Sequence, residues 1–168
     1  RILEAEEDDS VTLAFSESQV MVSASTAEII SKLIEGNFPQ YEGLIPQDFK
    51  YRVAFQKEEM RQAIQLASVF STESAHDIKM QFDPEAGGLS VQSSNSEIGQ
   101  NSSRVPVQLE LGQEEAFAIT FNYHYLLDGL SISNGERITF ALNDADSPAV
   151  MRDAEDDSLL YLVMPIRE

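Results

Sequence analysis

The chain has 168 residues, of which 42% are hydrophobic and 24% are charged, values typical of a folded protein of one or one and a half domains. Its formal net charge of −18 excludes tight nucleic-acid binding through an open basic surface, because that affinity comes from cations that displace counterions. A ring that encloses DNA could still carry this charge, because it holds DNA by topology and needs only a locally neutral or basic lining. Without cysteine or a long apolar run, the sequence also excludes disulfides, thiolate chemistry and a membrane-spanning helix.

The N-terminal part contains strand patterns and little helix. Residues 11–15 and 20–24 alternate in the manner of strands, and a third apolar segment covers residues 29–34. Two glycines and two prolines within residues 35–46 mark an irregular connection. The chain has no initiator methionine and no signal peptide, so we expect it to begin within a longer protein. Residues 1–46 are therefore predicted to be the end of one domain and the connection to the next.

A complete strand and helix pattern begins near residue 50. Residues 51–55 are predicted to form a strand, and the apolar residues that follow it recur at helical spacing. Residues 78–82 and 89–91 then alternate as strands on either side of a turn. A polar stretch, residues 93–103, leads to the apolar residues at 105–107.

The same order returns about 65 residues later. Residues 117–121 are predicted to form a strand, Asn122 caps a second amphipathic helix, and residues 138–142 and 149–151 alternate again before a final apolar strand. The order of one strand, one helix and three strands thus occurs twice, which indicates an α+β domain over residues 47–168. Its two helices are predicted to share one face of antiparallel sheets.

The outward side of the first predicted helix is unusual for so acidic a chain. Lys57, Arg61 and Gln65 recur at helical spacing, so this side is predicted to carry two cations and no acid. Such a side is a candidate for a functional surface. Chance clustering of two among eleven cations is the simpler explanation when the helix is taken alone.

Catalytic and metal-binding patterns are weak. The two histidines, His76 and His124, lie in a polar connection and in a first helical turn, where surface roles are usual. Nucleophile elbows, metalloprotease motifs and glycine-rich phosphate loops are absent from the sequence. Acidic turns at residues 144–146 and 153–157 lack the spacing and the central glycine of a calcium loop. We predict that the protein is not an enzyme and that it uses no metal and no cofactor.

The C-terminal stretch, residues 159–167, is a strongly apolar strand that ends in Met-Pro-Ile-Arg. An ordinary closing strand is the simplest interpretation. The alternative is a groove for short linear motifs, because apolar or rigid residues at the ends of elements form such surfaces. The residues of this kind are Pro39, Leu44, Met164, Pro165 and Ile166.

Five short motifs, in the order in which the family carries them, resemble the bacterial DNA polymerase III beta subunit, the sliding clamp. They extend from residue 32 almost to the end of the chain, and each is weakly specific by itself. The motifs are Lys32–Tyr41 (KLIEGNFPQY), Ile45-Pro46, Phe121–Leu130 (FNxxYLLDGL), Ser147–Val150 (SPAV) and Tyr161–Arg167 (YLVMPIR).

The resemblance implies a cytoplasmic processivity factor of DNA replication. Family members form a head-to-tail homodimeric ring of six similar domains, in which helices line a hole that holds duplex DNA. Residues 1–46 would then be the end of the middle domain with its connection, and residues 47–168 the complete third domain. Without the first domain no closed ring can form, so we predict a monomer or a non-native dimer for this chain.

The resemblance also assigns candidate site residues. DNA polymerase and clamp-loader subunits would dock short linear motifs into a groove, duplex DNA would meet the helix-lined channel, and the partner subunit would meet the end of the first helix. The groove residues would be Pro39, Gly43, Leu44, Pro148, Leu162, Met164, Pro165, Ile166 and Arg167; the channel residues Lys57, Arg61 and Gln65; and the ring-interface residues Val69, Phe70 and Glu97.

One other class of function fits the composition. An acidic, β-rich calcium-binding or adhesion module would use the aspartate-rich turns as oxygen ligands. Calcium titration combined with thermal melting separates the two hypotheses, because only a ligand that prefers the folded state raises the melting temperature.

Overall fold

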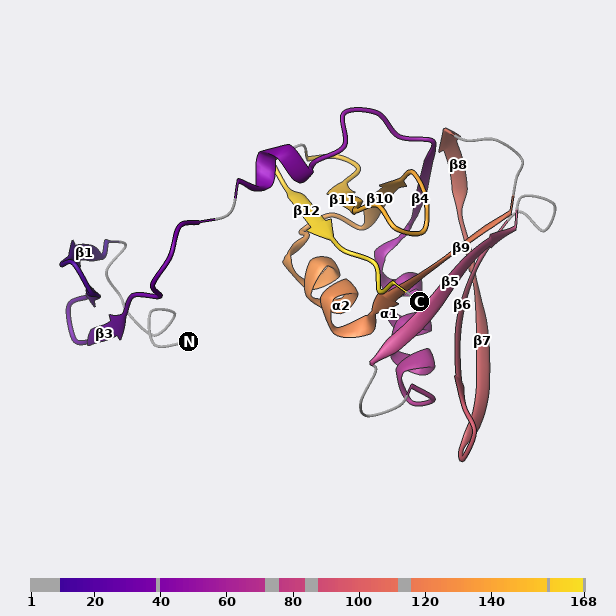
Figure 1. The fold of residues 1–168 in the computed structure, drawn as a ribbon, viewed down its shortest axis with the longest axis horizontal. Helices are drawn as coiled ribbons and strands as arrows, with labels where there is room; N and C mark the ends of the chain where they lie inside the picture. Colours follow the sequence, from indigo (N-terminus) through magenta and orange to yellow (C-terminus); the bar gives the residue numbers. More distant parts are fainter. Residues whose placement is uncertain are drawn as a thin grey trace. The chain divides into compact units, whose positions relative to one another are not determined.

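The structure is a computed structural model that describes residues 10–38, 40–71, 76–83, 88–111, 116–156 and 158–167. The chain divides into two compact units, Arg1–Gln40 and Tyr41–Glu168. Figure 1 shows the ribbon of both units. Across the described ranges, no helix is both long enough and apolar enough to cross a membrane.

The first unit is a three-stranded antiparallel meander. β1 (Thr12–Phe15) pairs with β2 (Gln19–Ser23), which pairs with β3 (Glu28–Lys32), so all three apolar segments predicted here form strands. None of the described residues in this unit is buried, and the Phe15 side chain is 70% exposed. The meander therefore has no hydrophobic core among its described residues.

The second unit contains two antiparallel sheets, preceded by a short 3-10 helix, η2 (Tyr41–Leu44). The five-stranded sheet has the order β12-β11-β10-β4-β8, and the four-stranded sheet has the order β7-β6-β5-β9. The strands are β4 (Tyr51–Gln56), β5 (Asp77–Asp83), β6 (Gly88–Asn95), β7 (Gly99–Pro106), β8 (Gln108–Leu111), β9 (Phe117–Asn122), β10 (Arg137–Leu142), β11 (Ala149–Asp153) and β12 (Leu160–Val163).

The predicted duplication is present and the two copies exchange strands. The order β4-α1-β5-β6-β7 is followed by β9-α2-β10-β11-β12, with β8 between the copies. β4 pairs with β10 of the second copy, and β9 pairs with β5 of the first copy. Because each sheet takes a strand from both copies, neither copy can complete its sheet alone. The predicted α+β class is confirmed, with two helices packed on antiparallel sheets.

Both helices bury one stripe against the sheets, and Figure 1 shows them next to each other. Asn122 caps the second helix as predicted, since its side-chain oxygen accepts a hydrogen bond from the His124 N–H at 3.0 Å. α1 (Lys57–Ser68) buries Met60, Ala63, Ile64 and Ala67, whereas α2 (Tyr123–Ile132) buries Leu126, Gly129 and Leu130. These residues meet Phe121, Phe140 and Ile138 of the strands in one core.

The polar stretch 93–103, to which its own residue pattern assigned no strand, forms part of two paired strands. β6 and β7 form a long hairpin through this stretch, with Ser93 opposite Asn101 and Val91 opposite Ser103. Serine, asparagine and glutamine occur here because much of this hairpin is exposed and β7 is an edge strand of its sheet. An edge strand needs few apolar residues, so its alternation is weak in the sequence. β8, whose four residues are all exposed, was not predicted.

Candidate functional site

The C-terminal segment joins the two sheets. β12 pairs with β11, and the tail after it continues to β9, where the Ile166 N–H donates a hydrogen bond of 2.8 Å to the Thr120 carbonyl oxygen. Figure 1 shows this tail leaving β12 and running towards β9. Pro165 is buried, whereas Met164 is 48% exposed and Ile166 is also exposed. The tail thus presents two apolar side chains to solvent from a backbone that is held in place.

Three other predicted groove residues lie close to this segment. Ala149 is paired with Val163, so Pro148 and Met164 follow at the same end of the β11–β12 strand pair. Leu162 lies opposite Val150, on the face of the sheet that points away from the helices. Arg167 is exposed at the end of the tail. A hollow of about 180 Å³ lies beside Ile166, between the tail, β9 and the turn at residues 145–146.

The remaining predicted groove residues are Gly43, Leu44 and Pro39. Gly43 and Leu44 are exposed in η2, within the same unit as the C-terminal tail. Pro39 lies outside the described residues.

The outward side of α1 carries an acid that the sequence reasoning left out. The Arg61 guanidinium donates to Glu58 from Nε at 2.8 Å, and the two residues also form a salt bridge. Arg61, followed by Gln62, holds the pKa of the Glu58 carboxyl down to about 2. The prediction of two cations without an acid is therefore wrong, because residues three apart also face each other on a helix.

Lys57 begins α1 and is directed to the other helix. Its Nζ donates a hydrogen bond of 3.0 Å to the Ser133 carbonyl oxygen, just after the C-terminal end of α2. A cation at that position satisfies a carbonyl that the helix leaves unpaired and complements the helix dipole. Gln65 is exposed on the following turns of α1. The three predicted channel residues thus share one helix, but both cations already have partners.

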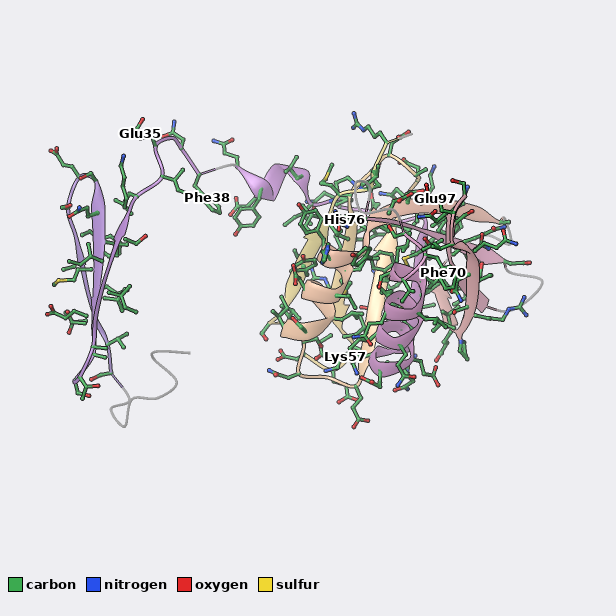
Figure 2. The ribbon with its side chains drawn as sticks, turned by 90° about the horizontal axis from the view of Figure 1, so that it is seen from below. Glu35, Phe38, Lys57, Phe70, His76 and Glu97 are labelled. Atoms are coloured by element: carbon green, nitrogen blue, oxygen red, sulfur yellow. The ribbon has the colours of Figure 1, made fainter. Side chains whose placement is uncertain are left out.

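The predicted ring-interface residues gather at the other end of α1. Val69 is exposed and Phe70 half-buried just after the helix, and Figure 2 shows Phe70 and Lys57 at opposite ends of it. The ring of Phe70 lies against Gly99, at the tip of the β6–β7 hairpin that also carries Glu97. The fold brings an apolar pair and one exposed carboxylate together at an edge of the four-stranded sheet.

The acidic turns are occupied by hydrogen bonds from their own neighbourhood. Hydrogen bonds from Ser147 and the nearby backbone lower the pKa of the Asp144 carboxyl, and the Glu155 N–H contributes most to the lowered pKa of Asp153. Asp153 also accepts from the Gly135 N–H at 2.6 Å and the Ser133 hydroxyl at 3.1 Å. Across the described residues, no group of three or more potential ligands is arranged to hold a metal ion.

One cluster was not expected from the sequence. The rings of His76 and His124, 48 positions apart, lie 4.9 Å from each other, and Tyr123 packs against both of them. The Tyr123 N–H donates to the His76 carbonyl oxygen at 2.9 Å. The pairing of β5 with β9 creates this contact, so only the register of the sheet could have predicted it.

The fold and the C-terminal segment agree with a known family. The sequence profile described as "DNA polymerase III beta subunit, C-terminal domain" matches residues 42–167, which is most of the chain. The chain belongs to this family. The resemblance carried by the five motifs is thereby confirmed for the second unit.

Individual beta clamps show the same relationship. The beta sliding clamp of Pseudomonas aeruginosa is 30% identical over 162 residues, which cover 96% of this chain and 43% of that protein. The solved beta sliding clamp of C. crescentus superimposes with a TM-score of 0.84 at 30% identity, covering 100% of this chain and 43% of that one. A solved Pseudomonas aeruginosa sliding clamp bound to griselimycin gives a TM-score of 0.83 at 29% identity, covering 99% and 44%. The chain thus spans less than half the length of these beta clamps.

Proposed function

We propose that this chain is the C-terminal part of a sliding clamp, a non-catalytic processivity factor that encircles duplex DNA and tethers the replicative polymerase. Residues 1–46 would form the end of the middle domain with its connection, and residues 47–168 the third domain. The family match over residues 42–167 carries this proposal. The absence of buried residues in the described part of the first unit supports it, because a lone meander lacks a second layer.

The docking site for partner proteins would be a groove at the C-terminal segment. Met164 and Ile166 offer apolar contacts, and methionine adapts its shape to different ligands. Pro148, Leu162, Pro165 and Arg167 would form the surrounding wall, with Gly43, Leu44 and Pro39 from the connection. DNA polymerase and clamp-loader subunits, each with a short linear motif, are the proposed partners. The griselimycin-bound relative supports the idea that clamps of this family have a ligand-accepting surface.

The DNA channel would be lined by the outward side of α1, including Lys57, Arg61 and Gln65. Arg61 is paired with Glu58, and the Lys57 ammonium keeps its charge but is directed to the Ser133 carbonyl oxygen, so this side offers few direct phosphate contacts. A chain of net charge −18 is therefore expected to hold DNA by enclosure, with few direct phosphate contacts. Such a lining would permit sliding, since it creates no strong attachment to any one phosphate. Val69, Phe70 and Glu97 would contact the first domain of the partner subunit and close the ring in the cytoplasm.

The groove can be tested on the 168-residue chain itself. A fluorescent peptide with one glutamine and two apolar anchors should bind measurably by anisotropy, although weakly, because the middle-domain side of the groove is incomplete. Met164→Ala should weaken this binding at least threefold, the order expected from losing the contacts of one apolar side chain. Leu66→Ala, which removes a similarly exposed side chain from α1, is the matched control. Equal binding by both variants would remove the C-terminal segment from the proposed groove.

A further inference from the structure

A second hollow lies on the outward face of the five-stranded sheet, opposite the helices. Its volume is about 270 Å³. Two arginines on neighbouring rows of the sheet, Arg52 from β4 and Arg152 from β11, stand on its rim together with Thr139. Its other lining residues are Phe49, Glu110, Ala141, Val150, Asp153 and Ala154.

The floor of this hollow is apolar and fixed. Val150 is only 2% exposed and Ala141 is also buried, yet neither belongs to the main core, so they form a separate small cluster at Phe49. The backbone next to Phe49 is tied down by Asn143. The Asn143 side chain accepts from the Lys50 N–H at 2.8 Å and donates to the Asp48 carbonyl oxygen at 2.9 Å. The shape of the hollow is therefore set before any ligand arrives.

The charges around the hollow leave two guanidinium groups available. Neither Arg52 nor Arg152 forms a recorded side-chain hydrogen bond or salt bridge with another described residue. Of the two acids in the lining, Glu110 is paired with Arg137 at 3.5 Å, and Asp153 accepts hydrogen bonds from Gly135 and Ser133. In a chain of net charge −18, two arginines with no recorded side-chain partner among the described residues, placed at one rigid hollow, favour an anionic ligand.

The hollow is connected to the proposed docking groove by the register of the sheet. Leu162 lies opposite Val150, Val150 opposite Ala141, and Ala141 opposite Arg52, so one cross-strand row joins β12 to β4. Three steps of about 4.8 Å separate Leu162 from Arg52, which is roughly 14 Å along the surface. An extended peptide covers that distance with about four or five residues at about 3.3 Å each.

We propose that this arginine hollow binds the carboxylate of an acidic residue that lies about four or five positions from the apolar anchors of a docked partner motif. This inference rests on the proposed function, because it extends the same docking surface. The apolar floor would receive the methylene stem of a glutamate, while Arg52 and Arg152 donate charge-assisted hydrogen bonds to its oxygens. The arginine hollow would thus favour partners that carry an acidic residue near the motif, although the overall negative charge of the protein repels acidic chains.

Two peptides that differ only in a carboxylate or a carboxamide at one position test the inference. Both carry the glutamine and the apolar anchors, and one has glutamate and the other glutamine at the flanking position. At low salt the glutamate peptide should bind the 168-residue chain about threefold to tenfold more tightly, as expected for a partly exposed charge pair. The Arg52→Gln/Arg152→Gln double variant should lose this advantage and bind the glutamine peptide normally. The Lys32→Gln/Arg104→Gln double variant, which removes two exposed cations from other strands, is the control for net charge.

The possible outcomes separate the two proposals. Equal binding of both peptides to the unmodified chain would overturn the arginine hollow and leave the groove intact. A double variant that weakens both peptides alike would also overturn it, since the arginines would then act on the groove in general. Failure of both peptides to bind would overturn the groove and the hollow together. Circular dichroism of each variant shows whether the fold is retained.

Discussion

The two units of this chain are built from the same kind of antiparallel strand, but they differ in what the strands cover. In Arg1–Gln40, the described strands bury no residue, and apolar side chains such as Phe15 and Ile30 face solvent. In Tyr41–Glu168, two sheets and two helices enclose a continuous core. Alternation of apolar and polar residues therefore specifies a strand, whereas a stable unit requires a second layer against its apolar face.

The two units also differ in how their strands pair along the chain. Each sheet of the second unit combines three strands of one copy with one strand of the other, so both copies contribute to one shared core. The meander of the first unit has no such exchange, since each of its strands pairs only with neighbours in sequence. We therefore expect substitutions in the two units to differ sharply in their effect on stability.

The largest contrast should come from a buried phenylalanine. Phe121 is fully buried and its ring lies 5.7 Å from that of Phe140, so Phe121→Ala should lower the free energy of unfolding by about 3–5 kcal/mol. Phe15→Ala in the first unit should change it by less than about 0.5 kcal/mol, because that ring is exposed. Urea unfolding followed by circular dichroism measures both values. A large loss of unfolding free energy from Phe15→Ala would show that the first unit has a core, which would contradict the difference between the two units.

A second substitution probes close packing between α2 and the five-stranded sheet. A methyl group added at Gly129 would lie 2.7 Å from the Tyr161 ring, closer than van der Waals contact permits. Gly129→Ala should therefore cost about 1–3 kcal/mol, although alanine favours helices more than glycine does. Gly43→Ala, where an added methyl meets nothing within 4 Å, is the control. Stabilisation by Gly129→Ala would mean that Tyr161 moves away at little cost.

The N-cap of α2 should have a smaller effect. Asn122→Ala removes the acceptor for the His124 N–H and should lower the free energy of unfolding by about 1 kcal/mol. Asn122→Asp keeps an acceptor at this position and should retain most of the stability. Thermal melting of both variants checks the expectation. Equal losses from alanine and aspartate would contradict the capping role.

The smallest expected effect concerns the pH dependence of Glu58. Its pKa is lowered from 4.5 to about 2 by Arg61 and Gln62, so the folded state binds fewer protons than the unfolded state between these values. The resulting stabilisation is present above about pH 4.5 and is lost as the pH falls through about 2. NMR titration of the Glu58 carboxyl should give a midpoint well below 4.5, and Arg61→Gln should move it upward. An unshifted midpoint in the unmodified chain would show that the pair does not persist in solution.

The sequence predicted the helices and strands whose apolar residues follow a clear helical or alternating spacing. Asn122 before an apolar helical stripe predicted a capped helix, and the strand at β10 was predicted from strict alternation. The β6–β7 hairpin was predicted from its pattern only at residues 89–91, because polar edge residues such as Asn101 and Ser102 carry no hydrophobic signal. Composition and periodicity describe one element at a time, and they say little about an edge that faces water.

Some residues of the candidate site could be proposed from the sequence, whereas others depend on contacts between elements that are distant in the sequence. The C-terminal residues Met164 and Ile166 could be proposed from the sequence because they follow an apolar strand at its open end. The pairing of Arg61 with Glu58 required attention to residues three apart as well as four apart. The hollow at Arg52 and Arg152 depends on the register of three strands, β4, β10 and β11. No local pattern in the sequence reports that register.

Retention on DNA tests the central proposal most directly. A protein that extends this chain upstream to the length of the related beta clamps would be loaded onto nicked circular DNA and separated from free protein by gel filtration. We predict that it remains bound to the circle at high salt and is released when the DNA is cut once, because a closed ring holds DNA by topology and a charged surface does not. Salt-sensitive binding that is indifferent to cutting the circle would contradict the account.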